Sequence, residues 1–449
     1  MKSNKHKALL LIFGAFLVIG VYSLGYSISR ENFPYLFAAF SLSFLGMYGI
    51  YKLQKYQEIW LGIFLFGFLL RFILSHSIPL LSDDYARFLW DGEIVRLEGN
   101  PYDKTPQKLV EDSANELEFF ERLYPYLNSP NYYSVYPPSN QLLFGLAAEA
   151  SGENTLFGII SLRSFLLLGE LLVFFGLLKL FRRFDVPLRN LVLYWLNPLV
   201  ILEVIGNLHF EGIVLMFLLG SLIAYSKNKK FLAGTSWGLA IGVKLLPFVF
   251  LPSWLFFRKI KFSPFFWIGT LLAVCISFIG LVWDDAWINF LQSIRLYQGK
   301  FEFNASIYYL LREVGFWIKG YNTIETLGKV LSLTFVIWVW FISWKKAPKS
   351  LFKLADLWVL IYLSYLLLQP VIHPWYLIPG LGLSLMTGKK SFLVWSFAVI
   401  FSYQAYGNPN FEESSFYLVL EYALLLIALV WDYRPQFFST LNKLSKNES

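Results

Sequence analysis

Long apolar stretches alternate with short polar segments along the whole chain of 449 residues. A bilayer span takes about 20 apolar residues. The pattern therefore predicts membrane-crossing helices near 8–28, 34–51, 58–80, 156–181, 190–206, 208–226, 265–283, 325–344, 356–370, 374–387, 391–406 and 416–431. Residues 231–257 are also apolar, but they are interrupted at Lys244-Leu-Leu-Pro247 and at Pro252. This interruption predicts a broken helical hairpin of two short spans, with Lys244 at its tip.

These spans predict an all-α polytopic membrane protein with about 12–14 transmembrane helices. The stretch 138–150 is too short to cross alone and is expected to lie in or dip into the outer leaflet, and 305–318 is equally ambiguous. No internal repeat and no separable soluble domain is visible, so residues 1–449 are expected to form a single membrane domain.

Composition and charge give the expected orientation. The chain is 57% hydrophobic and 15% charged, with a net charge of +8. The basic residues cluster in short segments near 2–7, 52–55, 182–189, 227–230, 258–261, 345–353, 389–390 and 443–446. Cytoplasmic loops carry this excess, so we expect both termini inside, an uncleaved first helix and a cytoplasmic-membrane location. The loop 81–136, with eleven acidic and five basic residues, is then outside.

The basic residues therefore indicate membrane topology and not nucleic-acid binding. The single cysteine, Cys275, lies in an apolar run, which excludes an internal disulfide and a cysteine metal site.

A cluster of charges follows the span 58–80 with almost no spacer, and it contains Asp83, Asp84, Arg87 and Asp91. Ionised carboxylates at a membrane edge cost free energy if they enter the hydrocarbon. Their presence there therefore favours a catalytic role. One of the adjacent pair is predicted to act as a general base, with its proton affinity raised towards neutral by its neighbour. Arg87, one helical turn away, would restrain that rise or contact an anionic substrate. The alternative is an ordinary helix cap by Ser82 or Asp83.

Further polar residues interrupt apolar segments at turns on the same expected face. Glu203, Asn207, His209 and Glu211 lie between the spans 190–206 and 208–226. Their spacing suits hydrogen bonding to a phosphate or a sugar better than metal binding, because well-spaced ligands are too few. The sequence requires no cofactor, and it leaves open whether a divalent metal assists.

Two more groups are candidates at that face. Lys244 lies among apolar residues, where it could pair with a phosphate or reach the interface by extending its side chain. His373, in His-Pro-Trp-Tyr376, is either a binding residue or a member of the interfacial aromatic belt.

Three motifs resemble the glycosyltransferase C (GT-C) superfamily, in its bacterial mannosyltransferase-type branch. They are Ser82-Asp-Asp-Tyr-Ala-Arg-Phe-Leu-Trp-Asp-Gly92, Gly99-Asn-Pro-Tyr102 and Tyr136-Pro-Pro138, with weaker similarity at 197–211, 244–247 and 373–376. The resemblance implies a GT-C-like bundle whose first outer loop, 81–136, contains short amphipathic helices and the catalytic carboxylate. The spacing to Arg87 and Phe88 matches that carboxylate to Asp84 better than to Asp83.

The resemblance also implies a substrate class and a location. The enzyme would transfer a sugar, mannose by resemblance, from a polyprenyl-phosphate donor to a glycan or lipid-linked acceptor, on the outer face of the membrane. One base and no strong general acid suffice when phosphate leaves, which predicts inversion at the anomeric carbon. Arg87, His209 and Lys244 are candidates for stabilising the departing phosphate. Two alternatives are a transporter or flippase of lipid-linked sugars, and an O-antigen ligase or polymerase.

Overall fold

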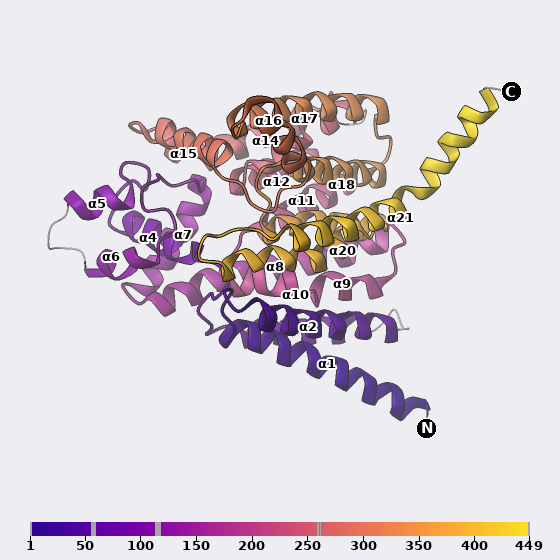
Figure 1. The fold of residues 1–449 in the computed structure, drawn as a ribbon, viewed down its shortest axis with the longest axis horizontal. Coiled ribbons are helices and arrows are strands. Elements are labelled where there is room, and N and C mark those ends of the chain that lie inside the picture. Colours follow the sequence, from indigo (N-terminus) through magenta and orange to yellow (C-terminus); the bar gives the residue numbers. More distant parts are fainter. Residues whose placement is uncertain (1, 55–59, 113–117, 258–259, 261, 448–449) are drawn as a thin grey trace.

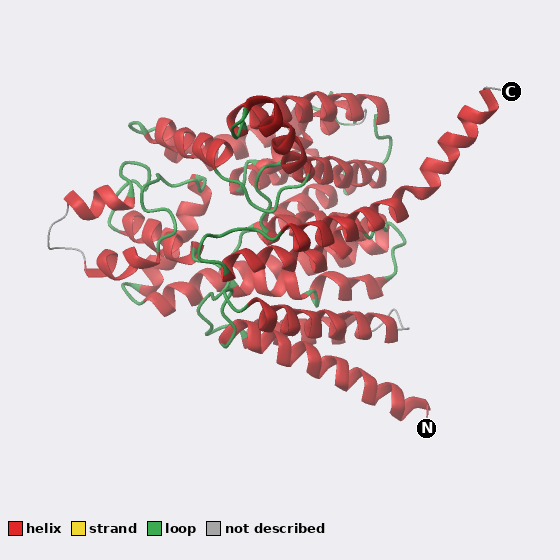
Figure 2. Cartoon of the chain, viewed as in Figure 1, coloured by secondary structure: helices red, strands yellow, loops and turns green. Residues whose placement is uncertain are grey.

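The computed structural model describes residues 2–54, 60–112, 118–257, 260 and 262–447. The described residues are helices joined by loops, with one isolated bridge between Phe303 and Val371 (Figure 2). The predicted all-α polytopic membrane fold is confirmed. The basic residues expected at 55, 258–259 and 261 lie outside the described residues.

The N-terminal half contains three helices, a helical cap, and a set of broken helices. The first three are α1 (Lys2–Tyr26), α2 (Phe33–Leu53) and α3 (Trp60–Ile73). The helical cap comprises α4 (Asp84–Arg96), α5 (Pro106–Asp112), α6 (Glu118–Leu123), η2 (Tyr124–Tyr126) and α7 (Pro138–Ser151). There follow α8 (Thr155–Arg183), η3 (Leu188–Leu191), α9 (Val192–Trp195), α10 (Pro198–Val200), η4 (Ile201–Gly206), α11 (Glu211–Ser226), α12 (Lys230–Val243), η5 (Leu246–Phe250) and α13 (Leu251–Phe256).

The C-terminal half completes the bundle. It comprises α14 (Pro264–Phe278), η6 (Ile279–Leu281), α15 (Ala286–Lys300), α16 (Ile307–Lys319), α17 (Ile324–Lys346), α18 (Leu351–Leu368), η7 (Pro374–Tyr376), α19 (Leu377–Thr387), α20 (Ser391–Ala398), η8 (Val399–Gly407) and α21 (Ser415–Asn447). The helical cap lies at one end of the bundle, and both termini lie at the opposite end (Figure 1).

Full-length spans are fewer than the 12–14 expected. Among the described residues, seven helices are long and apolar enough to cross a membrane, and the bent pair 188–195 and 198–206 makes an eighth. Three shorter apolar helices are Trp60–Ile73, Glu211–Ser226 and Leu246–Phe256. The apolar runs are present, but prolines and polar residues interrupt them and end the helices early. The interruptions bring irregular backbone into the bundle, which membrane proteins tolerate where it is buried in protein.

The close packing of α12 against α14 determines the course of the chain between them. A Cβ on Gly234 would lie 1.9 Å from the Phe266 carbonyl oxygen, and one on Gly242 would lie 2.2 Å from Ser277 Oγ. Small residues at this spacing let two backbones approach closely, and the order of the contacts makes α12 and α14 parallel. The chain between them must therefore return across the bundle, and η5 and α13 form that return after Lys244.

A buried ion pair joins α3 to α8 within the bundle. Arg71 Nη2 lies 2.7 Å from Glu170 Oε2, and both side chains are fully buried. Arg71 Nη1 also donates to the carbonyls of Gly67 and Trp195, and the Tyr194 hydroxyl donates to Glu170. Every charge in this group thus has a partner, as a buried pair requires.

Candidate active site

Asp84 is the first residue of α4, where the positive end of a helix dipole favours a carboxylate. Its Oδ1 accepts a hydrogen bond from Asn128 Nδ2 at 3.0 Å, and its Oδ2 accepts one from the Tyr136 hydroxyl at 3.2 Å. The same Oδ2 lies 3.6 Å from His209 Nε2. The carboxylate is nonetheless 21% exposed, so it is held in place and still accessible.

The pKa values of Asp84 and His209 shift in opposite directions from their usual values. Burial alone would raise the pKa of Asp84, but His209, and to a smaller extent Asn128, lower it to about 2. Burial alone would lower the pKa of His209, but Asp84 and Glu203 raise it to about 9. At neutral pH the structure therefore holds an ionised carboxylate against an imidazolium.

This finding corrects the expectation of a carboxyl group with its proton affinity raised towards neutral. Asp83 and Asp84 do not share a site, because Asp83 forms an ion pair with Arg30 from the loop between α1 and α2. The Asp83 side chain is 39% exposed. Each carboxylate thus has its own cation, which removes the repulsion that was expected to raise one pKa.

His209 lies between two carboxylates. Its Nδ1 is 3.0 Å from Glu203 Oε2, and its Nε2 faces Ser82 Oγ at 3.4 Å as well as Asp84. Its ring stacks on Trp375 with centroids 3.7 Å apart, and Trp375 stacks in turn on His373 at 4.4 Å. Turns from the two halves of the chain therefore meet at this imidazole.

The backbone around Glu203 departs from an α-helix. Asn197 caps the short α10 by accepting from the Leu199 amide at 3.0 Å, and residues Ile201–Gly206 form a π-helix. Leu208 then adopts a left-handed conformation with φ +66°. A π-helix is uncommon and frequently lies at a functional site, and a left-handed leucine is strained. They end the span early and turn His209 back against Glu203.

Glu203 and Asn207 are buried behind His209. Glu203 is 1% exposed and accepts hydrogen bonds from Asn207 Nδ2, at 3.1 Å, and from the Tyr403 hydroxyl of η8. Asn207 Oδ1 in turn accepts from the Leu81 amide at 3.4 Å. Asn207 thus ties the turn that holds His209 to the loop that holds Asp84.

Lys244 and Glu211 form a second charged pair at the site. The lysine is 26% exposed and makes an ion pair with Glu211, which is 2% exposed. The Lys244 ammonium also lies over the Tyr376 ring, 5.1 Å from its centroid. Burial lowers the pKa of His373 to about 3, so that ring is neutral. Lys244 retains donors that Glu211 does not use, because an ammonium has three.

Arg87 lies elsewhere than expected. Its side chain is buried, and its Nε donates to Asp91 at 2.7 Å and its Nη1 to the Tyr132 carbonyl at 3.0 Å. Asp91 also accepts from Ser134 and Gln141. In the parts of the chain that the structure describes, no contact joins Arg87 to Asp84. Its pairing holds the helical cap together.

Several residues at the site escaped the sequence analysis. Arg30 is a polar residue between two apolar spans, and its position in the gap 28–34 was the available signal. Asn128 lies in the expected outer loop 81–136 and Tyr403 in the predicted span 391–406, and nothing in the sequence marks either as a site residue, whereas Tyr136 belongs to the Tyr136-Pro-Pro138 motif without a predicted contact to Asp84. Within the described ranges, no group of three His, Cys, Asp or Glu side chains could hold a metal ion.

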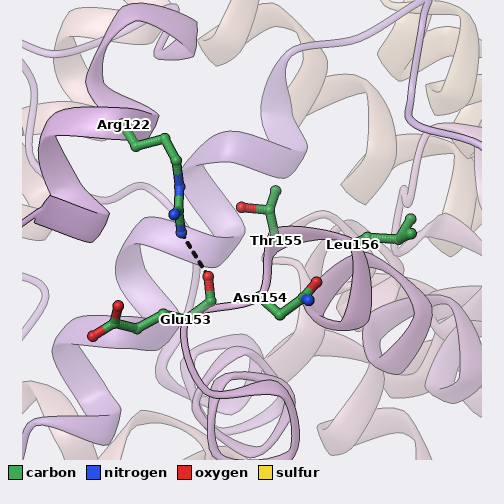
Figure 3. A pocket seen from close by; sticks show the side chains of 5 residues that line it. All are labelled: Arg122, Glu153, Asn154, Thr155 and Leu156. Carbon is green, nitrogen blue, oxygen red and sulfur yellow. Dashed lines mark hydrogen bonds between the residues drawn. The ribbon is translucent and has the colours of Figure 1, made fainter.

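A shallow depression of about 420 Å³ lies away from these residues. It is lined by Arg122, Glu153, Asn154, Thr155 and Leu156 (Figure 3). Arg122 donates to the Glu153 carbonyl at 2.6 Å. The depression shares no residue with the Asp84 site. Arg122 links α6 to the loop just before α8.

Residues 72–258 match a family model described as alpha-(1->6)-mannopyranosyltransferase, N-terminal domain. The resemblance to a GT-C type mannosyltransferase is confirmed over this segment. The matched residues include Asp84, His209 and Lys244, whereas His373 and Tyr403 lie beyond them. Among proteins of curated function, none matches the chain.

The opposite pKa shifts of Asp84 and His209 predict that the stability of the protein varies with pH and that this variation requires His209. A histidine pKa raised from 6.5 to about 9 contributes stability that is complete below pH 6.5 and lost as the pH rises through 9. The lowered pKa of Asp84 contributes stability above 3.8 that is lost as the pH falls towards 2. We therefore expect the melting temperature of the detergent-solubilised protein to exceed that of His209→Gln most between about pH 4 and 6.5.

The exposed His76 supplies the matched control. His76→Gln should leave this part of the stability profile unchanged, since His76 faces solvent. A constant difference between wild type and His209→Gln from pH 5 to pH 10 would show that His209 is not charged at the site.

Proposed function

We propose that this protein is an integral membrane mannosyltransferase that moves a mannosyl group from a polyprenyl-phosphate donor to a hydroxyl of a glycan or lipid-linked acceptor. The observation that carries the proposal is the location of the Asp84–His209 pair within the segment that matches the mannosyltransferase family. Asp84 is its general base.

The proposed chemistry is a single displacement. The acceptor oxygen attacks the anomeric carbon, the bond from that carbon to the phosphate oxygen breaks, and the phosphate leaves with the bonding electrons. Asp84 accepts the hydroxyl proton. A carboxylate of low pKa suffices, because the proton becomes strongly acidic as the oxygen forms its new bond. Attack from the face opposite the phosphate inverts the anomeric configuration.

The departing phosphate needs positive charge and hydrogen-bond donors. Lys244 is the candidate that the structure favours, because its ammonium is partly exposed and has donors to spare. His209 adds a second positive charge beside Asp84. Arg87 is a weaker candidate than its sequence position indicated, since Asp91 and the Tyr132 carbonyl already occupy it.

The proposed location is the outer face of the cytoplasmic membrane. The helical cap and the termini lie at opposite ends of the bundle, so cytoplasmic termini would put the Asp84 site outside. Membrane lipids then surround the bundle, and the lipid-linked donor would reach the site from the bilayer.

A transporter would also use broken helices such as 188–206 and the segment after Lys244. The family match favours transfer over transport. An O-antigen ligase or polymerase would share the membrane location and the lipid-linked donor. No feature of the site favours these alternatives over a mannosyltransferase.

The assignment of the base is tested by replacing each aspartate in turn. Asp84→Asn should reduce mannosyl transfer from a supplied polyprenyl-phosphate mannose by about 100-fold or more, because a general base contributes about 10²–10⁴-fold. Asp83→Asn is the matched control, and we expect it to retain most of its turnover because Asp83 pairs with Arg30. Transfer is measured with purified protein in detergent.

Size-exclusion profiles and melting temperatures establish that both variants are folded. Normal turnover in Asp84→Asn would remove this residue from the mechanism. Loss of turnover in Asp83→Asn alone would assign the base to its neighbour.

The role of Lys244 needs a double substitution, because Lys244→Met alone leaves the buried Glu211 without its cation. Lys244→Met/Glu211→Gln removes both charges and avoids that penalty. A charge-assisted contact to phosphate contributes about 1.5–3 kcal/mol. We therefore expect kcat/KM for the donor to fall by about tenfold to a hundredfold.

Glu211→Gln alone is the reference, because it keeps the ammonium, and the double variant should have a lower kcat/KM for the donor than this single variant. Normal donor kinetics in the double variant would restrict Lys244 to its pairing with Glu211.

A further inference from the structure

Arg163 is a buried cation on α8 with no carboxylate among its described contacts. Its side chain is 3% exposed, although it lies within a predicted membrane span. Its Nε donates to the Ile205 carbonyl at 2.7 Å, Nη1 to the Ser75 carbonyl at 2.6 Å, and Nη2 to the Ser77 carbonyl at 2.7 Å. Nη2 also reaches the Gly206 carbonyl at 3.3 Å. One guanidinium thus contacts four backbone carbonyls from two segments.

One segment is the end of a helix, and the other is the loop that follows a helix. Ser75 and Ser77 follow α3, which ends at Ile73, and the other two carbonyls belong to the last residues of the π-helix η4. The final carbonyls of a helix lack internal partners and carry its negative dipole end. The end of η4 and the two loop carbonyls after α3 together supply the partial negative charge that a carboxylate would otherwise provide. The five N–H groups of arginine in a planar fork suit this arrangement, whereas the three of lysine do not.

Each of the two segments leads directly into the site. The chain beyond Ser77 reaches Ser82 and Asp84, and the chain beyond Gly206 reaches His209. Two further contacts join these loops, from the Leu81 amide to Asn207 Oδ1 at 3.4 Å and between Ser82 Oγ and His209 Nε2 at 3.4 Å. Arg163 therefore fastens the two loops at their bases, on the side where they leave the bundle.

We propose that Arg163 is a positioning residue that sets the separation of Asp84 and His209 by binding the end of η4 and the start of the loop after α3, from which the two site segments emerge. It contacts neither substrate nor the reacting atoms. The catalytic part of this proposal rests on the proposed function, while the geometric part concerns only the pairing of two side chains. The two parts are therefore tested by different measurements.

The first test uses Arg163→Lys, which keeps the charge but cannot reach all four carbonyls. A misplacement of about 1 Å at a reacting group can cost about 100-fold, so we expect kcat for mannosyl transfer to fall by roughly tenfold to a hundredfold. KM for the donor should change little, because Arg163 does not touch it.

The second test needs no activity. Below pH 6.5, wild type should have a higher melting temperature than His209→Gln. The corresponding difference between Arg163→Lys and Arg163→Lys/His209→Gln should be much smaller. If Arg163→Lys does not fold, Arg163→Gln gives the same comparison, because its amide still donates to carbonyls without the full fork.

Arg71→Lys is the matched control. Arg71 is equally buried and also donates to two carbonyls, those of Gly67 and Trp195. We expect it to lower the melting temperature while leaving kcat and the contribution of His209 close to wild type.

The outcomes separate the two proposals. If Arg163→Lys keeps the wild-type contribution of His209 to pH-dependent stability, the positioning role is overturned, whatever the activity. If wild type transfers no mannose but Arg163→Lys still abolishes that contribution, the proposed function fails and the positioning role stands. Equal effects of Arg71→Lys and Arg163→Lys on the contribution of His209 would reduce Arg163 to general packing.

Discussion

The pairing of His209 with two carboxylates is the interaction on which the site depends. A buried imidazolium is stable only with opposite charge close by. Glu203 supplies that charge on the Nδ1 side and Asp84 on the Nε2 side. The same pairing keeps Asp84 ionised although it is largely shielded from water. Two further hydrogen bonds hold Glu203 on the Nδ1 side. Asp84 is the more exposed of the two carboxylates.

The broken helices make this pairing possible. A continuous helix over 190–206 would carry Glu203 along the bundle and would not turn His209 back onto it. The π-helix, the left-handed Leu208 and the early end of α3 place irregular backbone inside the protein. Its carbonyls need donors there, and Arg163 supplies them at the end of η4 and in the loop after α3. The interruptions that shorten the spans therefore create the site, and the buried arginine stabilises them.

The sequence predicts the class of fold because hydrophobic runs of membrane length have few alternatives. It also singles out Asp84, His209, Lys244 and His373, since polar residues that interrupt apolar runs are expensive. The structure brings their turns together. The ion-pair partners of these residues could not be predicted in the same way. Asp83 pairs with Arg30, and Arg87 pairs with Asp91, through contacts that depend on packing. The expected rise in a carboxyl pKa was wrong for that reason. Arg163 lies inside the predicted span 156–181 and carries the same signal, but its role could not be predicted because its partners are backbone carbonyls, which carry no sequence signal.

The most direct test of a single-base displacement is the stereochemistry of transfer. The matched family is named for an α-linked product, so inversion requires a donor in which mannose is β-linked to phosphate. Purified protein would be given chemically synthesised mannosyl-phosphoryl-polyprenol in either the α or the β form. The anomeric configuration of the product would then be read by nuclear magnetic resonance. Single displacement predicts that the product has the anomeric configuration opposite to that of the donor consumed. A β-linked product from the β donor, or transfer from the α donor with retention, would contradict it.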